Sequence, residues 1–437
     1  MNDPKLMILG MGMVGRSLLH ILLENRMFSL DDILVTDKSR KAFNYFRDLG
    51  GRKENFIHSE VDSKCYREVL DRLESGDYLI SLSVGCDCLV LARECSERSI
   101  HFICTSDDTF HDTGFREPFR YRTHHYQYKE LIEKTKGGAT SILQFGMNPG
   151  LISILTKKAL LDIVENDDSD FVAYNRGRLR KLAEAGEYPL LAKELQVISF
   201  IESDLDTTQT YMKEDENTVY STWSADDFYA EMNDRSIQKL GSLTSLEDHL
   251  KRMGVSPDQI FYYNKYDGTL VLDASGKDVM TEGYTVNGVF TGCVDVHEEV
   301  FSIHDYYTAR NDAGEIDYAP SVIFVYRPSD LALSSAHNKD IFRMRLIKKD
   351  RMLSGGETVG ITVEGANFHP FYTGVELLYD SDRLETPTVL EVSASVYAAI
   401  RYISNHPDMG IMYPEHLDVD EILSYTGQYL PVVSKRI

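Results

Sequence analysis

The chain has 437 residues, with 46 Lys or Arg against 69 Asp or Glu and a formal net charge of −23. Its length predicts two domains, and its 43% hydrophobic and 26% charged residues are typical of a globular protein. The charge argues against a nucleic-acid partner because phosphates bind basic surfaces, and no apolar run approaches the roughly 20 residues that cross a bilayer.

A glycine-rich motif follows the first apolar segment. Leu6–Leu9 has the composition of a buried strand, and the motif G-x-G-x-x-G at residues 10–15 leads directly into the helical pattern of residues 16–23. A second apolar run, Ile33–Val35, ends at Asp37, which lies 22 residues after the third glycine. This order of strand, glycines, helix, strand and acid predicts a dinucleotide-binding fold.

Each part of this motif has a physical role. Gly10 permits a tight turn, Gly12 lets the backbone approach a pyrophosphate, and Gly15 lets the helix pack closely against the strand. The helix that follows offers free N–H groups and the positive end of its dipole to the phosphates, and Met13 and Val14 of the loop are predicted to bind the cofactor with the glycines. The loop is therefore predicted to bind the cofactor.

Asp37 favours NAD over NADP as that cofactor. Its carboxylate accepts hydrogen bonds from a ribose 2′-hydroxyl and repels a 2′-phosphate. The positive charges of Lys38 and Arg40, just beyond it, act in the opposite direction.

Strand-like and helical segments alternate through residues 1–150, which predicts a parallel, doubly wound sheet of the Rossmann type. The six cysteines show no zinc spacing, which predicts thiols in a reducing compartment and a cytoplasmic protein. Ligands of such sheets lie beyond the carboxyl ends of the strands. The residues predicted there are Ser83, Val84, Thr105, Asp107, Asp108, Gly146, Asn148 and Pro149.

The pattern changes after a helix at residues 151–163. Short strand-like segments with turns fill residues 195–385 and predict an α+β domain with a mainly antiparallel sheet. These segments are residues 195–202, 218–223, 259–263, 269–272, 284–290, 321–326, 342–347 and 358–363. A helix at 389–403 begins a C-terminal stretch, 386–437, that we expect to complete the first domain. The substrate and dimerisation domain is then 151–385.

Trp223 is the only tryptophan, and acidic residues follow it along the chain. One interpretation is a core or interface anchor. The other is an indole face that binds an ammonium group by cation–π attraction, worth about 0.5–2 kcal/mol.

His297 and Glu299 form a second candidate. On a strand the two side chains share one face, and an imidazole beside a carboxylate is a usable acid/base pair. A surface charge pair is the alternative. A metal site is not predicted because no further histidines come at ligand spacing. Glu202 and Asp204 are placed after the strand that ends at Ile201, where acids are often solvated.

Asn148 precedes Pro149 at the end of a predicted strand and has two possible roles. It can cap the helix that follows, and it can hold the nicotinamide or a substrate amine. The chain shows no G-x-S-x-G elbow, no P-loop and no nucleophilic cysteine signature, which leaves hydride chemistry.

Taken together, these motifs resemble the bacterial homospermidine synthases, which are relatives of the saccharopine and carboxynorspermidine dehydrogenases. The similarity runs nearly end to end. Its most specific pieces are residues 146–150, Thr222-Trp223-Ser224 with Phe228 and Glu231, residues 297–305, residues 310–315 through 326–330, and residues 407–411.

The resemblance implies an activity. Such synthases hold NAD and join two putrescines, or spermidine and putrescine, into sym-homospermidine. Ammonia or diaminopropane is released through imine intermediates, and no net redox input is needed.

The resemblance also implies roles for single residues. Trp223 matches a cation–π residue that steadies a protonated intermediate, and Glu231 matches the carboxylate that pairs with the distal ammonium. His297 would transfer protons or position the substrate, and Asn148 would lie between cofactor and substrate. Further members of an acidic binding track would be Glu202, Glu299 and Glu357.

Three positions depart from the family pattern. Asp108 stands where the family usually has Glu, Glu357 replaces an Asp, and Gly85 stands where relatives carry an Asp. These changes affect the expected length of the amine substrate more than the expected reaction.

Two other functions remain open. A carboxynorspermidine- or saccharopine-type dehydrogenase reduces an imine formed with a carbonyl acid, and it calls for an arginine such as Arg327. A non-catalytic regulator would bind NAD and leave polyamines unchanged. In each case we expect a homodimer, since the sheet-rich domain can pair across a two-fold axis.

Overall fold

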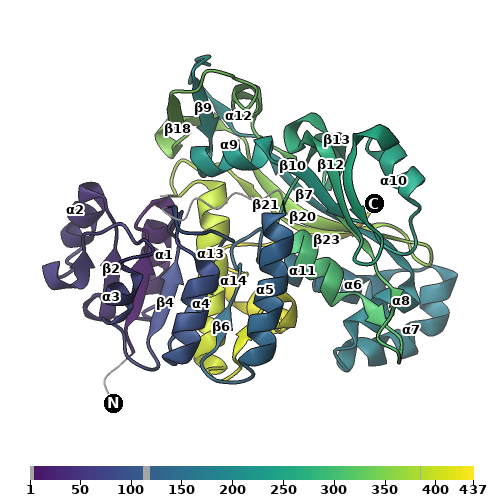
Figure 1. The fold of residues 1–437 in the computed structure, drawn as a ribbon, viewed down its shortest axis with the longest axis horizontal. Helices are drawn as coiled ribbons and strands as arrows, with labels where there is room; N and C mark the ends of the chain where they lie inside the picture. The colour runs from purple at the N-terminus through teal and green to yellow at the C-terminus, as the bar shows by residue number, and fades with distance from the viewer. Residues whose placement is uncertain (1–3, 112–118, 384) are drawn as a thin grey trace. The chain divides into compact units, whose positions relative to one another are not determined.

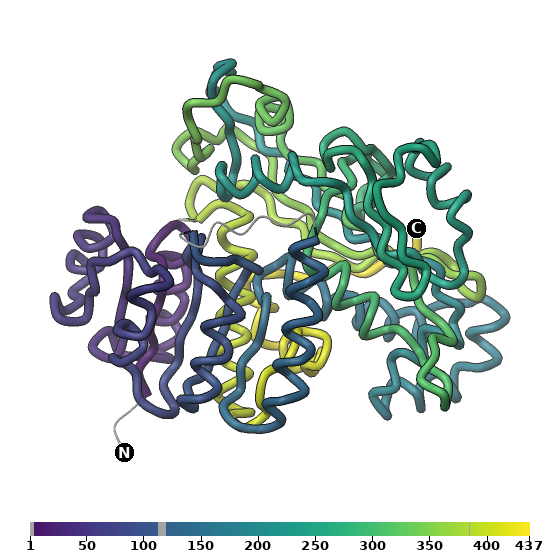
Figure 2. The backbone as a smooth tube through the Cα atoms, in the orientation of Figure 1, coloured from purple at the N-terminus to yellow at the C-terminus, as the bar shows by residue number. Residues whose placement is uncertain are grey.

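A computed structural model describes residues 4–111, 119–383 and 385–437. The chain forms two compact units, of which the first contains Met1–Leu151 and Val389–Tyr429. The second contains Ile152–Thr388 and Leu430–Ile437. The last residues form a strand of the second unit, whereas residues 389–429 belong to the first (Figure 2).

The first unit is built on a seven-stranded parallel sheet with the order β22-β6-β5-β4-β1-β2-β3. The four-residue strands are buried along their whole length, as expected for a sheet covered on both faces. The predicted doubly wound parallel sheet is confirmed. Its strands are β1 Leu6–Leu9, β2 Ile33–Thr36, β3 Phe56–Ile57, β4 Tyr78–Ser81, β5 His101–Cys104, β6 Ser141–Ile142 and β22 Ile411–Met412.

Helices connect these strands, and one comes from far along the sequence. Helix α13, Pro387–Asn405, runs among the elements of the first unit (Figure 1) and packs on α1, where the hydroxyl oxygens of Ser17 and Ser393 lie 2.6 Å apart. The other helices are α1 Met13–Glu24, α2 Arg40–Asp48, α3 Tyr66–Leu70, α4 Cys88–Glu97, α5 Arg120–Lys134 and α14 Val419–Thr426.

The second unit is built on a ten-stranded mixed sheet. Its main path is β11-β12-β10-β17-β7-β20-β21-β23, with β14 paired to β17 and β13 to β14. Only the β17–β7 pair in this sheet is parallel among the described residues, which confirms the predicted mainly antiparallel sheet. The strands are β7 Val197–Asp206, β10 Arg235–Lys239, β11 Ile260–Asn264, β12 Thr269–Ser275, β13 Met280–Thr285, β14 Gly288–Asp295, β17 Ser321–Arg327, β20 Gly356–Gly365, β21 Phe371–Leu378 and β23 Val432–Arg436.

Helices and three small strand pairs complete the second unit. The helices are α6 Leu151–Asn166, α7 Asp170–Glu184, α8 Tyr188–Leu195, α9 Ala225–Asn233, α10 Leu246–Arg252, α11 Glu299–Tyr306 and α12 Asp330–Ser335. The pairs are β8 Gln209–Thr210 with β19 Met352–Ser354, β9 Thr218–Ser221 with β18 Arg343–Leu346, and β15 Ala309–Arg310 with β16 Ile316–Tyr318.

Three local predictions about strands were wrong. Strand β7 does not end at Ile201 but continues to Asp206, because its polar residues 202–204 still pair with strands on both sides. The segment 284–290 is not one strand but the turn of the β13–β14 hairpin. His297 and Glu299 are not on a strand, since β14 ends at Asp295 and Glu299 begins α11.

All six cysteines are free, and five of them are buried. Across the described ranges, no helix combines the length and the apolar character needed to cross a membrane.

Candidate functional site

The glycine loop of the first unit has the geometry that its motif requires. Gly10 has a φ of +93°, and a Cβ there would lie 2.8 Å from the Leu82 carbonyl oxygen. A Cβ on Gly15 would lie 2.2 Å from the Gly10 carbonyl oxygen, so helix and loop touch through backbone alone. Gly12, in contrast, faces open space, with nothing within 4 Å of an added Cβ. The side of the loop at Gly12 is therefore free to receive a ligand.

The start of α1 suits an anion. Gly12 caps the helix without a side-chain hydrogen bond, and the first N–H groups of any α-helix have no partner inside it. These N–H groups begin at Met13 and Val14, next to the open space at Gly12. The loop residues therefore fit the pyrophosphate of a dinucleotide.

Asp37 lies directly after β2 and links that strand to the loop. One oxygen of its carboxylate accepts the backbone N–H of Met11 at 2.7 Å, and the other accepts that of Ser39 at 2.6 Å. The ammonium of the neighbouring Lys38 is paired with Glu60 at 2.6 Å. A negative charge is thus fixed beside the loop, and the nearest positive charge in sequence has its own partner.

The remaining residues predicted around the cofactor follow adjacent parallel strands. Ser83 and Val84 come after β4, Thr105 after β5, and Gly146 with Pro149 after β6. Since β1, β4, β5 and β6 are neighbours, their carboxyl ends form one edge of the sheet. A Cβ on Gly146 would lie 3.7 Å from Thr105, which shows that two of these turns are in contact.

Asn148 and Asp108 also lie in the first unit. Asn148 belongs to the turn closed by a 2.7 Å hydrogen bond from the Gly146 N–H to the Pro149 carbonyl, just before α6. Asp108 follows β5, where its carboxylate accepts the Ser106 hydroxyl at 3.1 Å. Gly85 has a φ of +75°, and a Cβ there would lie 2.0 Å from the ring of His111.

The second unit carries a face lined with acids, which we call the acidic face. Side chains at alternate positions of β7 share one side of the sheet, and these are Glu202, Asp204 and Asp206. Strand register adds further side chains to the same side, because directly paired residues point the same way. Glu357 pairs with Asp206, Phe324 with Glu202, Tyr326 with Asp204, and Asp295 with Phe324. All five acids are buried.

His297 lies at this face in contact with Glu299. Its Nδ1 is hydrogen-bonded to Glu299, and the carboxylate of Glu298 is 3.4 Å away. Burial alone would lower the pKa of His297, but Glu299, Glu298 and the nearby Glu231 raise it to about 10. The imidazole is therefore protonated at neutral pH. The imidazole of His297 and the carboxylates of Glu298 and Glu299 have atoms within 4.8 Å of one another. The protonated imidazole supplies the positive charge of this cluster.

The charge of His297 lowers the pKa of Glu299. Burial raises its pKa, but the charge of His297, its hydrogen bond to His297 and a hydrogen bond with Glu202 outweigh burial, and the pKa is lowered. The lowered pKa favours the ionised form of Glu299, which forms an ion pair with the imidazolium of His297.

Glu231 and Asp295 complete this part of the acidic face. Glu231 projects from α9, and burial raises its pKa well above the ordinary range, while the charge of His297 opposes that rise. Burial likewise raises the pKa of Asp295 to about 7. Burial thus disfavours the charged form of both carboxyl groups.

Trp223 stands at the other end of the same face. It occupies the short connection between β9 and α9, and its indole N–H donates to the hydroxyl of Tyr326 at 3.4 Å. The Tyr326 ring stacks on Phe324 at 6.1 Å, and the His297 ring lies 4.5 Å from Phe324. A line of aromatic rings thus connects Trp223 with His297.

The structure brings together Trp223, Glu202, Glu231, His297, Glu299 and Glu357 in the second unit, whereas Asn148 and Asp108 belong to the first. The sequence interpretation did not select Asp204, Asp206, Asp295 or Tyr326. The alternation of acids at 202, 204 and 206 was a usable signal for the first two. Nothing local identified the others, since only strand register brings them to this face.

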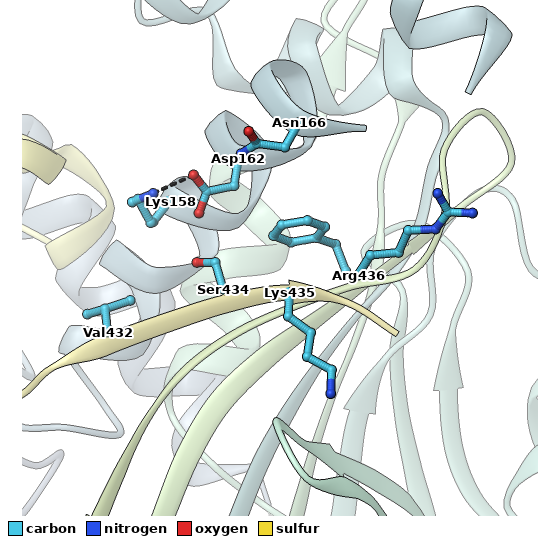
Figure 3. A pocket seen from close by; sticks show the side chains of 8 residues that line it. Lys158, Asp162, Asn166, Val432, Ser434, Lys435 and Arg436 are labelled. Atoms are coloured by element: carbon cyan, nitrogen blue, oxygen red, sulfur yellow. Dashed lines mark hydrogen bonds and ion pairs between the residues drawn. The ribbon is translucent and has the colours of Figure 1, made fainter. Parts of the chain in front are cut away.

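A cavity of about 430 Å³ elsewhere in the second unit contains none of the predicted residues. It lies between α6 and β23, and Figure 3 shows Lys158 and Asp162 paired on the helix above Ser434 of the strand. Its charged groups have mixed signs, unlike those of the acidic face.

The chain is similar to known proteins over nearly its full length. The homospermidine synthase of Mesorhizobium japonicum is 24% identical over 98% of this chain and 89% of that protein. The homospermidine synthase of Blastochloris viridis is 23% identical over 99% of this chain and 91% of that protein. Residues 6–142 match the family model described as the saccharopine dehydrogenase NADP binding domain.

Solved structures share the fold. The crystal structure of homospermidine synthase from Legionella pneumophila in complex with NAD has a TM-score of 0.84 at 23% identity and covers 100% of this chain and 92% of that chain. Saccharopine dehydrogenase from Saccharomyces cerevisiae has a TM-score of 0.52 at 10% identity, with 99% of this chain and 100% of that chain covered. The resemblance predicted from the sequence is confirmed: the chain is a homologue of the homospermidine synthases.

Proposed function

We propose that this protein is a homospermidine synthase. It joins two putrescines into sym-homospermidine with release of ammonia, or uses spermidine as donor with release of diaminopropane. The observation that carries the proposal is the acidic face, where eight carboxyl groups accompany the single imidazolium of His297. A buried surplus of carboxyl groups binds cations, and a diamine supplies two of them. The homologous synthases point to the same substrates.

The proposed cofactor is NAD, held by the glycine loop of the first unit. Its chemistry is to accept a hydride from the carbon that bears an amine and to return it to the new imine. Asp37 disfavours a 2′-phosphate, and the pairing of Lys38 with Glu60 leaves less positive charge to oppose this preference. The match to an NADP-binding family model concerns the fold of this unit and not the charge at Asp37.

The carboxyl groups of the acidic face bind and orient the amines. Glu231 pairs with the distal ammonium, and Glu202 with Glu357 extends the binding track. The π face of Trp223 stabilises the positive charge of the iminium by about 0.5–2 kcal/mol. Electrostatic stabilisation of a cation needs this set of groups rather than an oxyanion hole.

His297 and Glu299 move protons. Because His297 holds its proton at neutral pH, it donates to the leaving amine. Glu299, whose pKa is lowered by His297, can accept the proton lost when the second amine attacks. Asn148 and Asp108, at the carboxyl edge of the first sheet, are proposed to orient the cofactor and the reacting amine. One proton is given to the leaving amine and one is taken from the attacking amine, so no net proton is gained or lost. This proton balance agrees with two putrescines giving one homospermidine and one ammonia.

The test is to supply purified protein with putrescine and a catalytic amount of NAD. Homospermidine and ammonia should appear in equal amounts without accumulation of NADH. Stoichiometric NADH with loss of putrescine would indicate a dehydrogenase, as would NADPH consumption with aspartate semialdehyde. Bound NAD with unchanged polyamines would indicate a regulator. We further propose that the protein is cytoplasmic and that it forms a homodimer. Sedimentation of the purified protein tests the homodimer.

A further inference from the structure

The connection that carries Trp223 is fixed at several points. The hydroxyl of Thr222 donates to Asp206 at 2.9 Å. The backbone N–H of Trp223 is also held, because it donates to the Ser221 hydroxyl at 3.2 Å. The indole N–H donates to Tyr326 at 3.4 Å. The backbone before the side chain and the far edge of the ring are thus both tied to the sheet.

Tyr326 and Asp206, the two hydrogen-bond partners in the sheet, are themselves held in place by packing and hydrogen bonds. Tyr326 is buried, stacked on Phe324 and met edge-on by Phe228 at 6.4 Å and 87°. Asp206 is buried and accepts the backbone N–H of Thr208 at 2.7 Å with its other oxygen. Both belong to central strands, β17 and β7, which pair along seven residues. Hydrogen bonds to these two residues therefore restrict the movement of the Trp223 side chain.

The charge around Tyr326 keeps its hydroxyl in the form that this contact needs. Burial raises the pKa of Tyr326 well above its ordinary value, and the charges of Asp204, Glu357 and Asp206 raise it further. The hydroxyl is therefore neutral at every physiological pH. Because the edge of the indole is bound to it, the negative face of the ring remains available for a cation.

We propose that Tyr326 and Asp206 are positioning residues, which hold the Trp223 indole in one orientation over the acidic face. The proposal rests on the proposed function, in which that indole stabilises a cationic intermediate. Tyr326 acts through the indole N–H, and Asp206 acts through Thr222. A fixed ring meets the cation without the entropy cost of being ordered during the reaction.

Trp223 is the only tryptophan in 437 residues, so its fluorescence reports this contact directly. The probe is the emission maximum and anisotropy of the indole, excited beyond the tyrosine absorption band, with and without putrescine. Tyr326→Phe removes one oxygen and keeps the ring stacked on Phe324. We expect a shifted emission maximum, a lower anisotropy and a kcat reduced roughly three- to tenfold, the range for one neutral hydrogen bond, with less change in KM.

Two further variants separate positioning from general stability. Thr222→Val removes the hydroxyl bound to Asp206, keeps nearly the same side-chain shape and leaves Asp206 itself unchanged. It should lower the anisotropy of Trp223 in the same way. Tyr318→Phe is the matched control: it removes another buried tyrosine hydroxyl of the same unit, which donates to the Val197 carbonyl at 2.9 Å. This control should lower the melting temperature without changing the emission of Trp223.

The outcomes are distinct. Wild-type emission, anisotropy and kcat in Tyr326→Phe would overturn the positioning role of Tyr326, and a wild-type Thr222→Val would overturn that of Asp206. Equal spectral changes in Tyr318→Phe would also overturn the proposal, because the effect would then be general loosening. The spectra need no turnover, so a wild-type protein that makes no homospermidine would contradict the proposed function instead.

Discussion

Replacing Glu299 with Gln tests the electrostatics of the acidic face most directly. The substitution keeps the size of the side chain and removes the charge that is hydrogen-bonded to His297. At 1.36 kcal/mol per pKa unit, the rise of the His297 pKa from 6.5 to about 10 corresponds to roughly 5 kcal/mol in favour of the imidazolium. Glu299 is its largest source after the opposing effect of burial. Without Glu299 we expect the pKa of His297 to fall to its ordinary value or below.

The assay is an NMR titration of protein with labelled histidine. The signals of His297 among the 13 histidines are identified by their absence in His297→Gln. In the wild type, the raised pKa contributes stability that is complete below pH 6.5 and is lost as the pH rises towards about 10. In Glu299→Gln this loss of unfolding free energy between pH 6.5 and 10 should disappear.

A control and a refuting result complete this test. Glu298→Gln removes a carboxylate 3.4 Å from the same nitrogen and should lower the pKa of His297 by a smaller amount. If His297 still titrates near pH 10 in Glu299→Gln, the imidazolium is held by other groups. The proton-accepting role proposed for Glu299 would then be wrong.

Three further predictions concern the cofactor loop and the acidic face. Gly12→Ala should fold normally and lose dinucleotide affinity, because its Cβ enters open space, whereas Gly15→Ala should also lower the melting temperature; calorimetry with NAD titration separates the two. Since burial raises the pKa of Asp295 to about 7, putrescine affinity should rise as the pH increases through 7, and Asp295→Asn should flatten this rise in calorimetric titrations. Trp223→Phe should reduce kcat modestly and Trp223→Ala severely; equal activity of wild type and the Ala variant would remove the cation–π role.

The cofactor loop could be predicted from the sequence because its structure is encoded locally. Two glycines stand where backbone touches backbone, and a third faces open space. The strand before them and the helix after them are adjacent in sequence, so one window of about 30 residues contains the whole βαβ unit. Asp37 extended the prediction to the type of cofactor by the same local logic.

The contact between His297 and Glu299 was predicted from an incorrect structure. A strand places residues two apart on one face, and the structure instead has a loop that turns into α11. Both geometries bring side chains two positions apart together, so the prediction of the pair did not test the assignment of the strand. The difference matters for chemistry, because at the start of the helix Glu299 also reaches Glu202.

The rest of the acidic face was beyond sequence interpretation because it depends on strand order. Asp295 and Glu357 are more than 60 residues apart and lie on strands that pair with different neighbours. They reach one face only because β17 and β7 are parallel and in a particular register. A shift of one residue in either pairing would turn the same side chains to the opposite face. The buried acids are therefore a property of the topology, which no local pattern contains.

The composition of this face links stability to function. Burying carboxyl groups without cations is unfavourable, and burial accordingly raises the pKa values of Glu231 and Asp295, which disfavours their charged forms. A bound diamine would supply the missing charge and allow these groups to ionise. Binding should then release protons and raise the melting temperature, and both effects should grow with the number of charges on the amine. A surface with paired charges would show neither effect, so the two measurements test whether the buried carboxyl groups are the source of the proposed preference for polyamines.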